Sequence, residues 1–302
     1  RTVYFGTGSA VTLRRDGARL AGARVGALPP RPTFVPLARD DELLVTRDPT
    51  PGRAARRGEG GVLEPARVPC SLADVFADVR PGHRILFDDG RIAGVVTAAD
   101  DETLRVRITS VPPGGGKLRA EKGINLPDTE LRTPAFGEHD GELLDWAAAH
   151  VDMVGLSFVQ RPDDVARLVQ ELDARGRRDA GVVLKIETAI AFERLPELLF
   201  AGLASPPLGI MLARGDLAAE VGWGRLAEVQ EQILWLAEAA HVPVVWATQV
   251  LDSMARTGQP SRAEVTDAAM GGRAECVMLN KGPFIVDTVR FLGGVLERFL
   301  AR

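Results

Sequence analysis

Residues 208–217 read LGIMLARGDL, an apolar run followed at once by charged residues. The run Leu208–Leu212 is apolar along its whole length, which is typical of a strand buried on both faces of a parallel sheet. Arg214, Gly215 and Asp216 follow where such a strand would end. The same change from apolar to polar occurs at the ends of four further runs: Val151–Phe158, Gly181–Ile186, Val242–Ala247 and Glu275–Leu279.

These five runs lie roughly 25 to 35 residues apart, the size of one βα unit. Apolar residues at helical spacing lie between them, which predicts amphipathic helices. These residues are Val165, Leu168, Val169 and Leu172, then Leu226, Val229 and Ile233, and finally Val289, Leu292, Gly293 and Leu296. Five consecutive units indicate an α/β protein, with either a doubly wound sheet or part of a (β/α)₈ barrel.

Before about Lys117 the sequence has short apolar stretches separated by Gly, Pro and charged residues. Leu104–Ile108 alternates apolar and charged side chains, as a strand with one solvent-exposed face does. Arg80–His83 and Asp88–Gly90 have turn chemistry, because Gly and Asp tolerate the dihedral angles of tight turns. We predict a small β-rich domain over residues 1–118 and an α/β domain over 119–302. Other strands are predicted at Ser9–Leu13, Glu42–Thr46 and Ile92–Val96.

Each predicted strand of the second half ends in polar residues. Parallel strands place their carboxyl ends at one edge of the sheet, and in barrels that edge carries the active site. A matching set at five strand ends therefore predicts a functional site there. Its candidate residues are Ser157, Lys185, Glu187, Arg214, Gly215, Asp216, Thr248, Gln249, Asn280 and Lys281.

Glu187 and Asp216 are candidates for sharing a divalent ion, since Mg²⁺ prefers a few carboxylates completed by water and substrate oxygens. Lys185 is two residues from Glu187 on a strand, so both side chains point to the same face. A lysine, two carboxylates and Mg²⁺ suit a small anionic substrate that develops an enolate. The alternative is that Lys185 and Glu187 form only a buried ion pair.

Gly215 lets the backbone approach a ligand closely, and the start of the following helix favours anions. An ordinary βα turn is the alternative interpretation. Thr248 is neutral, so its functional role would be hydrogen bonding or proton relay. Its alternative role is the N-cap of a helix that contains Leu251 and Met254.

The composition argues against several classes of protein. The net charge of −4 gives no reason to expect nucleic acid or an anionic membrane as a partner. The apolar runs are too short to cross a bilayer, and residues 1–15 lack the apolar region of a secretory signal. Cys70 and Cys276 are too few for a disulfide framework or a zinc site, so we expect reduced thiols in a cytoplasmic protein.

Taken in order, the motifs of this chain resemble the pyruvate kinase family. The resemblance covers about Val79 to Leu279 and implies a partial (β/α)₈ TIM barrel, made of the last five βα units, after a small β domain. The matching stretches are Phe87–Gly90, Lys122–Pro127, Ser157–Val159, Lys185–Glu187, Ile210–Leu217, Ala247–Gln249, Leu251–Met254, Ser261–Val265 with Asp267, and Cys276–Leu279.

The resemblance also implies roles for individual residues. Glu187 and Asp216 would bind the divalent metal, Mg²⁺ or Mn²⁺, and Lys185 would stabilise the enolate and the transferring phosphoryl group. The Arg214–Asp216 segment would hold the substrate carboxylate, and Thr248 would contact the substrate beside the enolate carbon that gains a proton. Family members transfer phosphate from phosphoenolpyruvate to ADP, giving pyruvate and ATP in glycolysis, with Mg²⁺ and usually K⁺.

Four features depart from the family pattern. The N-terminal barrel strands, with an Arg-x-Asn-x-Ser motif that grips phosphate and K⁺, have no match, and neither has the C-terminal regulatory domain. Residues 280–284 read NKGPF where the family has Ser-Gly-Glu-Thr, which puts ADP binding in question. The opening, Arg1–Arg67, fits the family's β domain poorly. We expect an incomplete chain with aggregation-prone barrel edges and a homo-oligomer in the full-length form.

Three functions stay open on this basis. The first is a phosphotransferase that uses phosphoenolpyruvate and ADP. The second is a Mg²⁺-dependent lyase or aldolase acting through a pyruvate enolate, which draws on the retained Lys185, Glu187 and Asp216 and the altered 280–284 segment. The third is a non-catalytic binding protein, suggested by the missing phosphate-gripping arginine.

Overall fold

The computed structural model describes residues 8–26, 34–59, 61–72, 74–204 and 207–300. Within this part the chain divides into two compact units, of which one contains an N-terminal hairpin and the other begins at Val35. The hairpin pairs β1 (Ala10–Arg15) with β2 (Ala18–Arg24) in antiparallel register. Asp16 and Gly17 close it with φ angles of 50° and 81°, because a two-residue hairpin turn requires positive φ. The strand predicted near the N-terminus is therefore confirmed.

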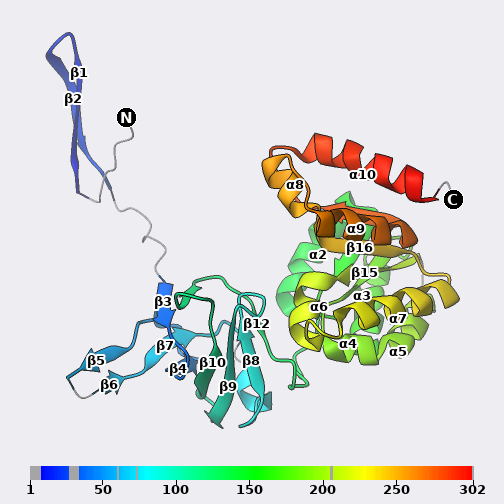
Figure 1. The fold of residues 1–302 in the computed structure, drawn as a ribbon, viewed down its shortest axis with the longest axis horizontal. Helices are drawn as coiled ribbons and strands as arrows, with labels where there is room; N and C mark the ends of the chain where they lie inside the picture. Colours follow the sequence, from blue (N-terminus) through cyan, green and yellow to red (C-terminus); the bar gives the residue numbers. More distant parts are fainter. Residues whose placement is uncertain (1–7, 27–33, 60, 73, 205–206, 301–302) are drawn as a thin grey trace. The chain divides into compact units, whose positions relative to one another are not determined.

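The β-rich part, residues 34–125, is built on a six-stranded sheet in the order β12-β8-β9-β10-β4-β7 (Figure 1). Neighbouring strands are antiparallel except β4 and β7, which are parallel. β3 pairs with β11, and β5 with β6, in two small sheets. The elements are β3 (Phe34–Leu37), β4 (Glu42–Thr46), β5 (Arg56–Gly58), β6 (Gly61–Glu64), β7 (Ala66–Pro69), α1 (Val75–Asp78), β8 (Arg84–Phe87), β9 (Ile92–Ala99), β10 (Thr103–Ser110), β11 (Gly116–Arg119) and β12 (Ile124–Asn125).

The alternation predicted for Leu104–Ile108 is present in β10. Its apolar side chains at 104, 106 and 108 are at most 1% exposed, whereas the two arginines between them face solvent. The Asp88–Gly90 turn is also confirmed, because Asp88, Asp89 and Gly90 have φ angles of 54°, 56° and 76°. These features match a strand with one dry face and a turn that needs left-handed residues.

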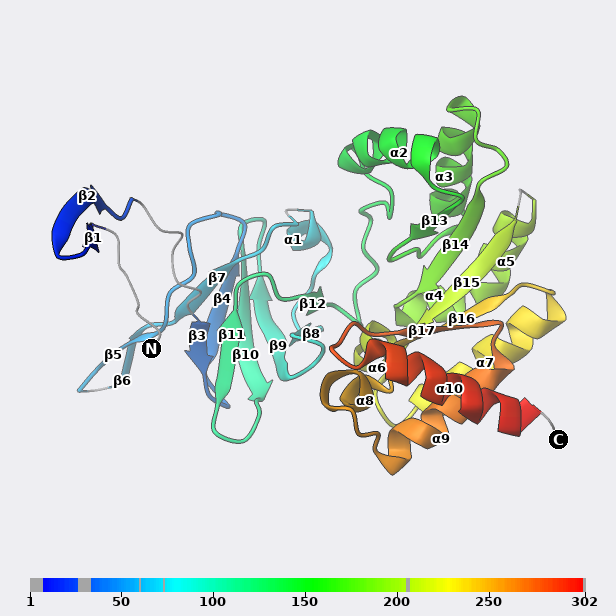
Figure 2. The same cartoon turned by 90° about the horizontal axis from the view of Figure 1, so that it is seen from above.

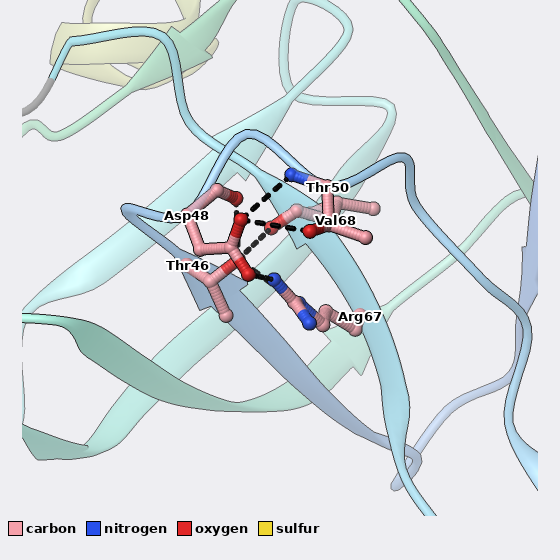
Figure 3. Close-up of polar contacts among 5 residues, drawn as sticks. All are labelled: Thr46, Asp48, Thr50, Arg67 and Val68. Carbon is pink, nitrogen blue, oxygen red and sulfur yellow. Dashed lines mark hydrogen bonds and ion pairs between the residues drawn. The ribbon is translucent and has the colours of Figure 1, made fainter.

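A polar cluster joins the end of β4 to β7 (Figure 3). The Asp48 carboxylate accepts the backbone N–H and the hydroxyl of Thr50 at 2.9 and 2.8 Å and pairs with Arg67. These hydrogen bonds lower the pKa of Asp48 to about 2, and the bond from the Thr50 backbone has the largest effect. Thr46 accepts Arg67 Nε at 3.1 Å and donates to the carbonyl of Val68 at 3.4 Å. The turn after β4 is thus fixed by side chains where the strand ladder stops.

The α/β part, residues 138–300, contains a curled half-barrel sheet of five parallel strands in the order β13-β14-β15-β16-β17 (Figure 2). Helices α3, α5 and α7 lie along one side of it. The elements are α2 (Glu138–His150), β13 (Met153–Leu156), α3 (Pro162–Ala174), β14 (Gly181–Ile186), α4 (Ala189–Glu193), α5 (Leu195–Leu203), β15 (Leu208–Ala213), α6 (Arg214–Val221), α7 (Leu226–Ala239), β16 (Val244–Val250), α8 (Asp252–Thr257), α9 (Arg262–Met270), η1 (Gly271–Arg273), β17 (Cys276–Leu279) and α10 (Ile285–Leu300).

All five strands predicted from the apolar runs are present in this part. The stripes predicted for α3 and α7 face the core, as Val165 and Val229 at 0% exposure illustrate. The stripe predicted for α10 was partly wrong, because Val289 is 56% exposed while Thr288 is buried. Thr288 can be buried because its hydroxyl donates to the carbonyl of Phe284 at 2.9 Å. A buried threonine therefore takes the place that the apolar pattern assigned to valine.

Within the described ranges of the chain, none of the helices combines the length and the apolar character needed to cross a membrane. Cys70 and Cys276 are both free thiols, as the sequence predicted.

Candidate functional site

Lys185 and Glu187 project from the carboxyl end of β14, as their spacing predicted. Lys185 Nζ lies 2.9 Å from Glu187 Oε1 and donates to Ser157 Oγ, just after β13, at 2.7 Å. The other oxygen of Glu187 accepts the backbone N–H of Phe158 at 2.6 Å. The side chain of Glu187 is 4% exposed and that of Lys185 is 27% exposed. The carboxylate is therefore buried with one polar contact at each oxygen, while the ammonium group keeps access to solvent.

Asp216 lies in the first turn of α6, directly after β15, and is half-buried. Burial raises the pKa of its carboxyl group, and the charge of Asp89 adds to that rise. A hydrogen bond from Asn125 and the positive charge of Lys185 oppose it. β14 and β15 are neighbours, with Ile186 opposite Leu212, so the strand ends that carry Lys185, Glu187 and Asp216 lie side by side. These three residues form one charged cluster.

The side chain of Arg214 binds other residues of the chain. Its guanidinium donates to the carbonyls of Ala247 and Thr248 at 2.9 and 2.6 Å and pairs with Asp267. It also lies 4.5 Å from the ring centre of Trp246 and is only 9% exposed. Arg214 thus joins the end of β15 to the end of β16 and to α9.

Thr248 is positioned by its neighbour across the sheet. Its Oγ1 accepts the backbone N–H of Gly215 at 2.8 Å, so it does not cap the following helix, whose N-cap residue is Leu251. Thr248, Gln249 and Leu251 have φ angles of 68°, 56° and 49°. Left-handed backbone at non-glycine residues is strained and persists only where surrounding contacts hold it, often near functional sites. The contacts of Arg214 with this segment supply such a restraint.

Sequence reasoning did not assign roles to Asn125 and Glu220. Both are buried, at 5% and 7% exposure. Asn125 lowers the pKa of Asp216, and the charge of Asp216 raises the pKa of Glu220. Burial raises the pKa of Glu220 to about 7, opposed by hydrogen bonds from the Ala189 backbone and from Asn125. The only signal in the sequence was the matching Lys122–Pro127 stretch, which gave Asn125 no role.

The altered segment 280–284 packs against α8. Asn280 Nδ2 donates to Asp252 Oδ1 at 3.0 Å, and the N–H of Phe284 donates to the carbonyl of Ala255 at 3.0 Å. A Cβ atom on Gly282 would lie 2.1 Å from the carbonyl oxygen of Ala255, so only glycine fits there. Asn280 is therefore part of the α8 packing. Lys281 is exposed.

The carboxylates present fit a hard divalent cation with few protein ligands. Over the described residues, no three His, Cys, Asp or Glu side chains gather closely enough to hold a metal. Glu187 and Asp216 supply two carboxylates, and Mg²⁺ commonly takes its remaining ligands from water and substrate. A cation would also compensate the cost of keeping half-buried Asp216 charged.

A hollow of about 510 Å³ lies away from this cluster, at the amino ends of β16 and β17. Glu238, His241, Arg273 and Glu275 are among its lining residues, and none of the predicted site residues is. In parallel sheets the chemistry lies at the carboxyl ends of the strands. The charged cluster, and not this hollow, is therefore the candidate active site.

Known proteins resemble the chain over most of its length. A family model described as "Pyruvate kinase, barrel domain" matches residues 30–284, starting earlier than the motifs had indicated. A pyruvate kinase of Methylorubrum extorquens is 34% identical over 301 aligned residues, which cover 95% of this chain and 58% of that protein. Pyruvate kinases of Thermotoga maritima and Clostridium acetobutylicum are 36% and 32% identical, over 67% and 70% of this chain and 41% and 43% of theirs. The chain spans about half the length of these relatives.

Proposed function

This chain belongs to the pyruvate kinase family, and from that premise we propose that it carries the enolate- and metal-binding part of a phosphotransferase. The reaction would convert phosphoenolpyruvate and ADP to pyruvate and ATP. The observation that carries the proposal is the pairing of Lys185 with Glu187 and Ser157, beside half-buried Asp216. A cation held between strand ends suits a substrate whose oxygen gains negative charge during the reaction.

Lys185 would supply positive charge that stabilises this oxygen. Its ammonium group is oriented by Ser157 and Glu187 but still reaches solvent, so it can contact an enolate oxygen and the phosphoryl group in transfer. Lys185 and Glu187 do form the ion pair that was the alternative interpretation of their spacing. This ion pair is compatible with the proposed role, because it fixes the lysine in place. Pre-oriented charge lowers the barrier because little reorganisation is needed during the reaction.

Glu187 and Asp216 would hold Mg²⁺ or Mn²⁺. When bound, such an ion neutralises charge on the phosphoryl and enolate oxygens. Glu187 has both oxygens engaged in hydrogen bonds, yet each carboxylate oxygen has a further lone pair for a ligand. Asp216 would be the second ligand, and the cation would offset the cost of charging this half-buried carboxyl group.

The Arg214–Asp216 segment would hold the substrate carboxylate. Arg214 is bonded to Ala247, Thr248 and Asp267, so we assign it the support of the segment. We assign anion binding to backbone N–H groups in the first turn of α6 other than that of Gly215, which donates to Thr248 Oγ1. The first N–H groups of a helix have no partner within it and favour anions. Thr248 Oγ1 accepts from Gly215, which leaves its own proton available for the enolate carbon.

At the level of the fold, we propose that the five-stranded sheet represents the last five units of a (β/α)₈ barrel and that the β-rich part is the family's small β domain, with a boundary near residue 118. ADP and ATP, a K⁺ requirement, a homo-oligomer and a cytoplasmic setting are further proposals that rest on the family. The replaced 280–284 segment, packed on α8, keeps the lyase or aldolase alternative in view.

The test is an assay of the purified protein for pyruvate and ATP formation from phosphoenolpyruvate and ADP with Mg²⁺, with and without K⁺. Lys185→Ala should abolish turnover, whereas Lys117→Ala, which changes an exposed lysine on β11, should leave it unchanged. Absent turnover with Mg²⁺-dependent exchange of pyruvate protons in D₂O would favour the lyase alternative. Loss of both would favour a binding protein.

A further inference from the structure

Strand β16 carries a bulge at its carboxyl end, in the candidate site. β16 pairs with β17 at Trp246 and again at Val250. Between these two pairings β16 has residues 247, 248 and 249, whereas β17 has Met278 alone. A bulge interrupts the hydrogen-bond ladder and redirects side chains, and bulges are common beside active sites. Buried carbonyl groups of the bulge therefore need partners other than the neighbouring strand.

The bulge is conformationally strained at Thr248. Its φ angle is 68°, and that of the next residue, Gln249, is 56°. A positive φ is a genuine outlier for a β-branched side chain, because its Cβ substituents crowd the backbone. Such a conformation persists only where contacts from the surrounding structure hold it.

Arg214 supplies these contacts. Its Nε donates to the carbonyl of Ala247 at 2.9 Å and its Nη2 to that of Thr248 at 2.6 Å, so it binds two carbonyls of the bulge. The remaining nitrogen, Nη1, pairs with the Asp267 carboxylate. The Arg214 side chain is only 10% exposed. A buried guanidinium requires an opposite charge, and Asp267 provides it.

Asp267 is held in place by the helix that carries it. Glu264 lies three residues earlier on α9, so the two carboxylates occupy neighbouring positions on the helix surface. Glu264 accepts the backbone N–H of Ser261 at 2.9 Å and that of Ser253 at 2.6 Å, which joins the start of α9 to the start of α8. Helix α9 therefore holds both sides of the strained segment, through Glu264 at α8 and through Asp267 and Arg214 at the bulge.

We propose that Asp267 is a positioning residue for Thr248. Its charge keeps the Arg214 guanidinium against the bulge carbonyls, and the bulge in turn holds Thr248 Oγ1 2.8 Å from the N–H of Gly215. The catalytic consequence rests on the proposed function, in which Thr248 contacts the substrate beside the enolate carbon that gains a proton. The structural link from Asp267 to Thr248 does not need a substrate, so it has a test of its own.

The first experiment measures hydrogen exchange of the Gly215 amide by NMR, in the full protein without substrates. Asp267→Ala should raise the exchange rate about tenfold, the factor expected for loss of one hydrogen bond. Asp267→Asn should raise it less, because the amide oxygen still accepts from the guanidinium but carries no charge. Asp287→Ala is the matched control and should have no effect, since it removes a carboxylate from an exposed pair with Arg290 on α10.

The second experiment measures exchange of the pyruvate methyl protons in D₂O with Mg²⁺, which reports proton transfer without ADP. Asp267→Ala should lower the rate about tenfold to a hundredfold, the cost of misplacing a group at the reacting atom. A purely structural role would lower the urea midpoint and leave the rate per folded molecule unchanged. That result would overturn the proposal.

A double-mutant cycle shows whether Asp267 acts through Thr248. Thr248→Val removes the hydroxyl and keeps the shape of the side chain. In this background Asp267→Ala should not lower the methyl exchange rate further, because the group that it positions is absent. Equal effects of Asp267→Ala in both backgrounds would contradict the proposal.

Failure of this inference differs from failure of the proposed function. A wild-type protein without turnover or methyl exchange contradicts the proposed function, and the Gly215 amide still decides whether Asp267 holds Thr248. A wild-type protein that turns over, with unchanged Gly215 exchange in the Asp267 variants, contradicts only the positioning role. If Asp267→Ala does not fold, Asp267→Asn decides alone, since it keeps the shape and an acceptor atom.

Discussion

Glu220 is an acid whose burial shifts its titration toward neutral pH. Its pKa rises from 4.5 to about 7, mainly through burial, and the hydrogen bonds from Ala189 and Asn125 offset only part of the shift. Between those pH values the folded chain holds a proton that the unfolded chain has released. Stability falls with rising pH wherever the native state binds more protons, so Glu220 lowers the free energy of unfolding progressively from about pH 4.5 to pH 7.

Glu220→Gln should remove this pH dependence. In metal-free buffer the variant should match the wild type at pH 4 and exceed its free energy of unfolding by about 3 kcal/mol at pH 8, since one pKa unit corresponds to about 1.4 kcal/mol. Urea unfolding across this pH range measures the difference. The control Glu193→Gln, at an exposed position of α4, should change the free energy of unfolding by the same amount at every pH. A Glu220→Gln effect that does not vary with pH would contradict the assigned cause.

Arg214 is the residue whose loss should most weaken the site segment. A lysine at this position supplies a point charge, whereas the guanidinium serves two carbonyls, Asp267 and the face of Trp246 together. Arg214→Lys should lower the free energy of unfolding by about 3 kcal/mol, because buried groups lose their partners. Arg290→Lys, at an exposed pair, should change it by less than about 0.5 kcal/mol. Equal effects in urea unfolding would show that the guanidinium contacts matter little.

At the scale of residues, the sequence predicted the charged strand ends but not their supports. Lys185 and Glu187 were predictable together because a two-residue spacing on a strand places side chains on one face. Asn125 was not, because it reaches Asp216 from a strand far earlier in the chain, and only the folded topology shows that approach. The left-handed conformation of Thr248 could not be predicted either, because only Gly, Asn and Asp in a sequence indicate a positive φ angle.

At the scale of elements, periodicity located strands and helices better than it located their buried faces. β10 followed its alternation residue by residue, because an apolar residue at every second position has one way to be buried. α10 did not follow its stripe, because a threonine that bonds its own helix can replace a valine in the interior. The pattern of apolar residues alone does not predict that hydrogen bond.

The connection from β17 to α10 depends on a close approach at Gly282. Gly282→Ala should lower the free energy of unfolding by about 2 kcal/mol or more, because its Cβ would meet the backbone oxygen of Ala255 at 2.1 Å. Gly293→Ala, inside α10 and with nothing within 4 Å, should instead raise stability by about 0.5 to 1 kcal/mol. Thermal unfolding of both variants tests the contrast. An unchanged free energy of unfolding in Gly282→Ala would mean that the backbone around Gly282 can shift to accommodate the added Cβ.

At the scale of the whole molecule, the five-stranded sheet presents two outer strands, β13 and β17, each with one paired neighbour within the described part of the chain. Met153 on β13 is 66% exposed and Met278 on β17 is 37% exposed. Unpaired apolar edges favour association with other chains. The partial-barrel interpretation therefore predicts concentration-dependent self-association.

Met153→Lys should reduce that self-association, since charged residues on edge strands oppose pairing. Leu203→Lys makes a comparable change at an exposed site on α5, away from the sheet edges, and should have little effect. Sedimentation velocity at increasing protein concentration measures both. A wild-type protein that sediments as a monodisperse monomer at all concentrations would contradict the prediction.

Trp246 gives the site its own fluorophore. Trp146, Trp223 and Trp235 are at least 59% exposed, whereas Trp246 is 1% exposed beneath the Arg214 guanidinium. Water-exposed indoles emit at longer wavelengths and are accessible to aqueous quenchers, so the blue, unquenched part of the emission belongs to Trp246. Because Arg214 also binds the backbone of Thr248, that emission should respond to movement at the carboxyl end of β16 without any introduced label.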